Sequence, residues 1–266
     1  MKVIILAGGK TNLPGKLKNI PKSLIEIKGR PLLEYQLDLL KKYKLNDIRL
    51  SLFYKAKDIL KYLKKKDPKA KIRGKKGKIA GLEYVIGPKP LGTGGAIRSA
   101  AYGLKNEFLV MNGDVLTNIN LADYLKFYKN NISEPRFFSF LPFKKRVPYE
   151  TTLGAMAVFY TQDVGEMGLV KVKNDRMVKF TEKPDYPTSG YLNAGFYILS
   201  PQVFQTKEFK SKKHSQVFPI EKEIFPKLAE DDQLLVYVHR GLWTDIGSKE
   251  GLEKAEGIAE KLIEKE

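Results

Sequence analysis

The feature that most constrains the fold is a pair of short apolar runs that each end at a glycine-containing loop. Residues 3–7 (VIILA) lead into Gly8-Gly9. Residues 108–111 (FLVM) lead into Asn112-Gly113-Asp114. Continuous apolar runs of this length are typical of strands buried on both faces, as in a parallel sheet. The loops after such strands lie together at the carboxyl edge of the sheet, where α/β proteins bind ligands.

The rest of the first half alternates between helical and strand-like patterns, which predicts a Rossmann-like doubly wound α/β sheet through about residue 130. Its helices are expected at 31–40, 58–66 and 96–104, and its further strands at 48–52 and 83–86. The second half predicts a β-rich extension with strands at 155–159, 169–172, 177–181 and 195–199, and helices at 221–228 and from 249 onward. We expect one domain over 1–266, with a mixed sheet and two halves of about 1–130 and 131–266.

Composition excludes several kinds of chemistry. The 266 residues contain no cysteine, which excludes disulfides, thiolate metal sites and cysteine nucleophiles. Two histidines leave little room for imidazole chemistry. No apolar stretch approaches the roughly 20 residues of a membrane span, and the first apolar run is too short for a signal peptide. We therefore expect a cytoplasmic protein with no membrane partner.

The net charge of +18 predicts anionic ligands. Only eight of the 48 basic residues are arginine, the residue that most often reads bases in DNA, so we expect no nucleic-acid partner. The densest basic run, residues 55–78, is typical of a solvated helix face and a loop.

Two aspartates are candidates for binding a hard cation. Asp114 follows an apolar strand, and Asp245 follows the only tryptophan, Trp243. Magnesium commonly takes one or two carboxylates plus substrate oxygens, although each aspartate also fits an ordinary turn. The glycines at 92–95 open a predicted helix whose N–H groups suit a phosphate. Neither a P-loop nor a G-x-G-x-x-G fingerprint follows the first strand.

Taken in order, several segments resemble the sugar-phosphate nucleotidylyltransferases, also called nucleotide-sugar pyrophosphorylases. The resemblance covers the whole chain and is carried by residues 6–9 (LAGG), 21–24 (PKSL), 29–32 (GRPL), 90–96 (PLGTGGA), 112–114 (NGD), 182–184 (EKP), 193–195 (NAG) and 243–247 (WTDIG). It implies Mg²⁺-dependent transfer of a nucleotidyl group from a nucleoside triphosphate to a sugar 1-phosphate, with release of pyrophosphate. The loop at 91–96 favours mannose- or heptose-type 1-phosphates, and glucose 1-phosphate stays open.

The resemblance also implies roles for individual residues. Lys22, Asp114 and Asp245 would be catalytic, and the two aspartates would hold Mg²⁺. The nucleotide would contact Leu6, Ala7, Gly8, Gly9, Lys10, Lys22, Gly87, Pro88, Gly92, Thr93, Asn112 and Gly113. The sugar phosphate would contact Gly168, Glu182, Lys183, Asn193 and Gly195.

The chain departs from the family pattern at two positions. Asn12 stands where the family's opening loop carries an arginine that presses on the triphosphate, and Lys10 or Lys16 would have to replace that charge. Gly87 stands where the family often reads the base with Gln or Glu, so the sequence does not select the nucleotide. Two alternatives follow: a non-catalytic regulatory or binding member of the same fold, or a cytidylyltransferase for a non-sugar phosphate.

Two expectations concern assembly and domain content. Residues 135–143 are rich in phenylalanine and fit either a buried strand or an apolar surface of a homo-oligomer. Some relatives carry a C-terminal β-helix acyltransferase, and we expect no such second activity here.

Overall fold

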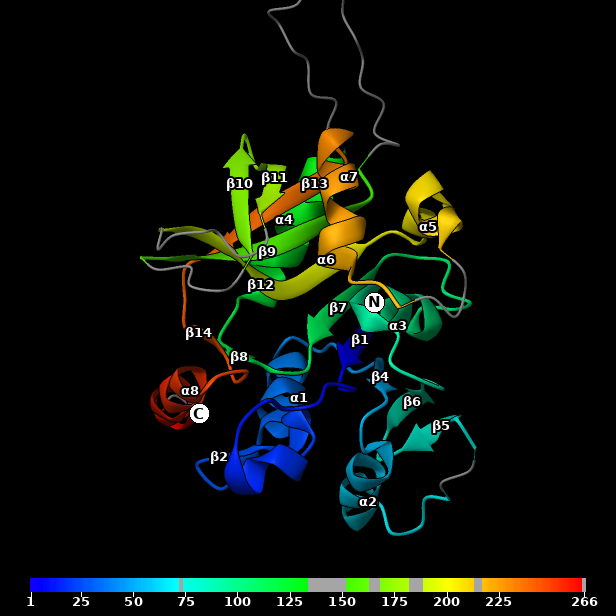
Figure 1. The fold of residues 1–266 in the computed structure, drawn as a ribbon, viewed down its shortest axis with the longest axis vertical. Helices are drawn as coiled ribbons and strands as arrows, with labels where there is room; N and C mark the ends of the chain where they lie inside the picture. Colours follow the sequence, from blue (N-terminus) through cyan, green and yellow to red (C-terminus); the bar gives the residue numbers. More distant parts are fainter. Residues whose placement is uncertain (72–73, 134–151, 163–167, 182–188, 213–216, 265–266) are drawn as a thin grey trace, which may run out of the picture.

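A ten-stranded mixed sheet forms the centre of the computed structural model, which describes residues 1–71, 74–133, 152–162, 168–181, 189–212 and 217–264 (Figure 1). The strand order is β10-β11-β13-β9-β12-β7-β1-β4-β6-β5. In the first half of the chain, the parallel strands are β7 (Phe108–Asn112), β1 (Lys2–Leu6), β4 (Ile48–Leu52) and β6 (Leu82–Ile86), with β5 (Lys76–Ile79) antiparallel at the edge. The predicted strands of the first half are confirmed.

The second half of the chain continues the same sheet. β12 (Gly190–Leu199) pairs antiparallel with β7, and β9 (Gly154–Thr161) pairs with β12. The sheet then continues through β13 (Leu234–His239), β11 (Arg176–Thr181) and β10 (Leu169–Lys173). The hairpin between β10 and β11 turns at Asn174 and Asp175, whose positive φ values of 51° and 57° fit a two-residue hairpin turn.

Helices cover both faces of the sheet. They are α1 (Leu32–Lys42), α2 (Ala56–Lys66), α3 (Gly92–Ala100), α4 (Leu121–Ser133), α5 (Lys207–Ser211), α6 (Ile220–Glu223), α7 (Phe225–Glu230) and α8 (Lys249–Ile263). Alternate residues of β1 enter opposite cores: Val3 and Ile5 pack with α1, α2 and α4 residues, and Ile4 packs with α3 and α7 residues. This arrangement confirms the doubly wound class. Among the described residues, no helix is both long and apolar enough to cross a bilayer.

Two predicted helices are corrected by the structure. The helix predicted at 96–104 starts earlier, at Gly92, and ends at Ala100. The prediction of a single helix at 221–228 is wrong, because α6 and α7 are separate helices and the helical conformation is interrupted at Ile224. Pro226 explains the break, since it has no N–H with which to continue the hydrogen bonds of the preceding turn.

A second, two-stranded sheet positions the end of the chain. β8 (Val115–Thr117) follows the end of β7, and β14 (Trp243–Asp245) pairs with it antiparallel. α8 packs on both strands, and the Ser248 side chain caps the start of the helix by accepting a hydrogen bond from Gly251 N. The residues predicted as a strand or oligomer surface, 135–143, lie outside the described residues.

Candidate functional site

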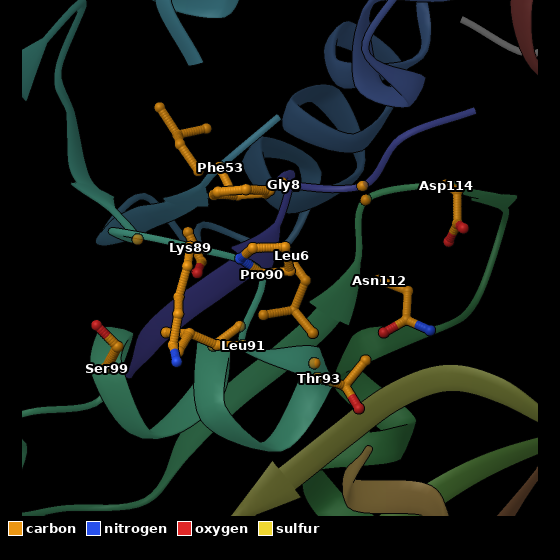
Figure 2. A pocket seen from close by; sticks show the side chains of 17 residues that line it. Leu6, Gly8, Phe53, Lys89, Pro90, Leu91, Thr93, Ser99, Asn112 and Asp114 are labelled. Atoms are coloured by element: carbon orange, nitrogen blue, oxygen red, sulfur yellow. The ribbon is translucent and has the colours of Figure 1, made fainter. Parts of the chain in front are cut away.

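A cavity of about 280 Å³ opens at the carboxyl edge of the parallel strands (Figure 2). Nine of the predicted residues line it: Leu6, Gly8 and Gly9 at the end of β1 and in the loop after it, Gly87, Gly92 and Thr93 after β6, and Asn112, Gly113 and Asp114 at the end of β7 and in the turn after it. Ala7 is buried behind this wall, and Lys10 and Pro88 are exposed beside it. Three loops that are distant in the sequence therefore form one concave surface, as expected at the edge of a parallel sheet.

The opening loop requires glycine where it meets the end of β4. A Cβ on Gly8 would lie 2.9 Å from Phe53 N, closer than side chains approach a backbone. The Gly8 carbonyl accepts a hydrogen bond from Tyr54 N at 3.2 Å. The loop after β1 is thus held backbone to backbone against the loop after β4.

The glycines at the start of α3 allow Phe218 to pack closely against the helix. Cβ atoms on Gly92 and Gly94 would lie 2.4 Å and 2.1 Å from atoms of Phe218. Gly94 N also donates to Phe218 O at 3.1 Å. The expectation that this helix start offers free N–H groups is therefore wrong at Gly94, because the segment before α6 already uses that donor.

Lys22 and Asp114 form an ion pair at the cavity edge. Lys22 lies in the short 3₁₀ helix η2 (Lys22–Leu24), and its Nζ is 2.8 Å from Asp114 Oδ2. Pairing of β8 with β14 brings Asp245 to the same place, where Ile246 N donates to Asp114 O at 2.9 Å. The three residues predicted to be catalytic thus converge from separate segments.

The charges of this cluster influence one another. Burial disfavours the charged form of Lys22, but Asp114 and then Asp245 more than offset it, so the pKa of Lys22 is raised. Burial and the neighbouring charge of Asp114 raise the pKa of Asp245, although Gly247 N donates to its Oδ1 at 2.8 Å. The raised pKa of Asp245 shows that the positive charges near it in the described part of the chain do not fully offset the two carboxylates.

This cluster fits a magnesium ion. Carboxylate oxygens are the ligands that Mg²⁺ prefers, and one or two of them commonly suffice when phosphate oxygens complete the shell. The repulsion between Asp114 and Asp245 would fall with a cation between them. In the described part of the chain, no group of three or more His, Cys, Asp or Glu side chains forms an alternative metal site.

One buried residue that sequence analysis missed holds the turn that carries Asp114. Gln36 in α1 is 2% exposed, and its Nε2 donates to the carbonyls of Asn112 and Val115, at 2.9 Å each. Both carbonyls flank Asp114 closely in sequence. The EYQL pattern of α1 gives no signal for this role, because Gln36 lies among the apolar residues of the buried helix face.

The predicted sugar-binding residues are only partly described. Asn193 N donates to Gly168 O at 3.4 Å, so these two residues are neighbours. A Cβ on Gly195, where φ is +75°, would lie 3.0 Å from the side chain of Asn112, which itself lines the cavity. Trp243 Nε1 donates to Ala194 O at 2.9 Å and ties β14 to this segment. Glu182 and Lys183 lie outside the described residues.

Sequence analysis also missed part of the cavity wall. Ser51, Leu52 and Phe53 at the end of β4 line it, as do Lys89 and Ser99 (Figure 2). The available signal was positional, since residues at the carboxyl end of any central parallel strand face this edge.

A family model described as "Nucleotidyl transferase" matches residues 2–261. The chain is 29% identical to a probable mannose-1-phosphate guanylyltransferase 1 of Oryza sativa subsp. japonica, over 93% of this chain and 61% of that protein. It is also 29% identical to the mannose-1-phosphate guanylyltransferase catalytic subunit beta of Dictyostelium discoideum, with the same shares covered. The chain thus spans about 61% of the length of these relatives.

Solved structures share the fold. HddC from Yersinia pseudotuberculosis complexed with GMP-PN is 27% identical, with a TM-score of 0.72, over 96% of this chain and 98% of that chain. A putative glucose-1-phosphate thymidylyltransferase from Bacillus anthracis has a TM-score of 0.73 at 20% identity, over 97% of this chain and 94% of that chain. The second likeness supports the fold alone.

Proposed function

Because the chain belongs to the nucleotidyl transferase family, we propose that it transfers a guanylyl group from GTP to a mannose-type sugar 1-phosphate. The observation that carries this proposal is the convergence of Lys22, Asp114 and Asp245 beside the cavity formed by the predicted nucleotide loops. Relatives named as mannose-1-phosphate guanylyltransferases and the guanine nucleotide in the HddC complex support the choice of substrates.

The proposed reaction is a displacement at phosphorus. A phosphate oxygen of the sugar 1-phosphate attacks the α-phosphorus of GTP, and a new P–O bond forms. The bond from the α-phosphorus to the oxygen bridging to the β-phosphate breaks, and pyrophosphate leaves. Chemistry of this kind depends mainly on positioning and on neutralising charge.

The residues of the cluster have distinct parts in this proposal. The Lys22 ammonium group, kept charged by its raised pKa, would stabilise the triphosphate oxygens. Asp114 and Asp245 would hold Mg²⁺, which would neutralise negative charge on the phosphates. Asn193, Gly168 and Gly195 would line the sugar side. Gly195 lies against Asn112 of the cavity wall, Gly195 N donates to Asn193 Oδ1, and Asn193 N donates to Gly168 O.

The proposal is tested by measuring pyrophosphate release with Mg²⁺ for each nucleoside triphosphate combined with each sugar 1-phosphate of a panel. We expect release from GTP with mannose 1-phosphate, and its loss in Asp114→Asn or with a chelator. Release of pyrophosphate only with another pair of substrates would identify a different nucleotide or sugar phosphate and would still support nucleotidyl transfer.

The non-catalytic alternative has one observation in its favour, the neutral and exposed Asn12 in the opening loop. A non-catalytic member would release no pyrophosphate with any pair. Calorimetry with GTP would then distinguish a subunit that still binds the nucleotide from a protein that no longer binds it.

A further inference from the structure

Two lysines from different loops meet at one tyrosine ring beside the cavity. Lys10 Nζ lies 5.8 Å from the centroid of the Tyr54 ring, and Lys55 Nζ lies 6.0 Å from it. An exposed cation gains only about 0.5–1 kcal/mol from such a ring. The Tyr54 ring thus brings two positive charges from separate loops to one place, and a local excess of positive charge favours binding of an anion.

The backbone connects this tyrosine to the cavity. Tyr54 N donates to Gly8 O at 3.2 Å, and Gly8 is packed against Phe53. Gly8, Gly9 and Phe53 all line the cavity. Lys10 directly follows one part of this wall, and Lys55 lies two residues beyond the other. Both ammonium groups are thus anchored next to the loop that is expected to face the triphosphate.

The backbone conformation of Lys55 is energetically unfavourable. Its φ of +46° is in the left-handed region, at the residue preceding α2, and its side chain does not cap the helix. This conformation costs a residue with a Cβ on the order of 1 kcal/mol. Strain of this kind is typical of functional sites, because it fixes the direction of a side chain.

Lys55 also holds the far end of the opening loop. Its Nζ donates a hydrogen bond to the carbonyl of Asn19, the last residue of the 3₁₀ helix η1 (Gly15–Asn19). The loop that contains Asn12 therefore begins next to Lys10, and its far end, at Asn19, is held by Lys55. Asp58 is the carboxylate near this ammonium group, at 3.8 Å and half exposed, and leaves the net charge at the ring positive.

We propose that Lys10 and Lys55, held together by Tyr54, bind the β- and γ-phosphates of the nucleoside triphosphate and supply the charge that Asn12 lacks. This inference rests on the proposed function. Lys22 does not fill that role alone, because its ammonium group is closely paired with Asp114 at 2.8 Å, whereas Asp58 lies 3.8 Å from the ammonium group of Lys55. From the sequence, Lys10 or Lys16 was expected to supply the positive charge that Asn12 lacks. The contacts at Tyr54 favour Lys10 and add Lys55, which was not predicted from the sequence.

The test compares the affinities of GTP and GMP by calorimetry with Mg²⁺. The variants are Lys10→Ala, Lys55→Ala, the double variant, and the control Lys57→Ala, which removes an exposed charge from the first turn of α2. We expect GTP to bind about tenfold more weakly in each single variant and weaker still in the double variant, with GMP affinity unchanged, because GMP lacks the outer phosphates. Lys57→Ala should match the wild type for both ligands.

A rescue variant tests whether the lysines replace the arginine of the family pattern. Asn12→Arg in the double-variant background should restore most of the GTP affinity, since arginine binds phosphate in a bidentate manner. Thermal melting confirms that each variant is folded. Unchanged GTP affinity in the double variant, equal losses for GTP and GMP, or no rescue in a folded protein would each overturn the inference. A wild-type protein that binds no nucleoside triphosphate would instead refute the proposed function.

Discussion

The ammonium group of Lys22 offsets part of the negative charge of two carboxylates at the edge of the cavity. Asp114 contacts it directly, and Asp245 acts on it through its charge. Burial lowers the screening of these charges by water, so each residue influences the other two strongly. Removing any one of them should therefore affect the whole cluster.

Lys22→Ala is predicted to lower kcat/KM by about 100-fold or more, because a preorganised charge at the reacting phosphates is lost. The effect should fall mainly on kcat, and the protein should remain folded. Lys126→Ala, an exposed lysine in α4, is the matched control for loss of one charge. Steady-state kinetics with both substrates checks the prediction, and wild-type rates for Lys22→Ala would contradict it.

Gln36→Leu is predicted to destabilise the protein by about 1–3 kcal/mol. The variant leaves the carbonyls of Asn112 and Val115 without their donor inside the core. Because these carbonyls flank Asp114, turnover should fall as well. Urea unfolding measures the free energy, and Gln202→Leu, at an exposed position, serves as the control. A variant with wild-type stability and rate would show that this side chain does not support the turn.

The resemblance to the family implied that Lys22, Asp114 and Asp245 act at one site, but local sequence patterns could not predict which contacts bring them together. Asp114 was placed by the apolar strand before it, and Asp245 by the motif around Trp243. Their approach depends on the pairing of β8 with β14, two three-residue strands from distant parts of the chain. Short strands carry too little pattern to be predicted, and Gln36 carried none.

At the scale of elements, the start of α3 depends on the absence of side chains. Gly94→Ala would place a Cβ 2.1 Å from the Phe218 ring and should destabilise the protein by about 1–3 kcal/mol through overpacking. Gly257→Ala in α8 meets no atom within 4 Å and should stabilise it by about 0.5–1 kcal/mol. Urea unfolding curves of both variants measure the change in the free energy of unfolding. A change of the same sign and size in the two variants would contradict the prediction.

Local patterns predicted most elements of the fold but not the order of the strands in the sheet. The strand β13 was missed although its sequence, LLVYVH, is strongly apolar. Its place is between β9 and β11, and it runs parallel to β9. No local pattern specifies such a strand order, because it depends on contacts between distant segments.

At the scale of the whole molecule, stability should depend on pH through His239. Burial lowers the pKa of this imidazole, whose Nδ1 faces Gly241 N at 3.4 Å and whose Nε2 lies 3.0 Å from Leu242 O. The folded state therefore favours the neutral ring. As the pH falls below about 6.5, the unfolded chain takes up this proton first, so stability is lost from there downward.

Urea unfolding followed by the fluorescence of Trp243, the only tryptophan, measures this effect at pH 5 and pH 7.5. The wild type should be less stable at pH 5, and His239→Gln should reduce the difference between the two pH values. His214→Gln, which removes the only other histidine, is the control. The same pH difference in the wild type and in His239→Gln would contradict the prediction.

We propose that the cavity and the cluster beside it join a guanylyl group to a sugar 1-phosphate. Mass spectrometry of the products formed from GTP and mannose 1-phosphate with Mg²⁺ tests this reaction directly. We expect GDP-mannose and pyrophosphate in equal amounts, only when both substrates are present, and none with Asp114→Asn. Release of GMP without the sugar phosphate, or the same product yield from Asp114→Asn, would contradict it.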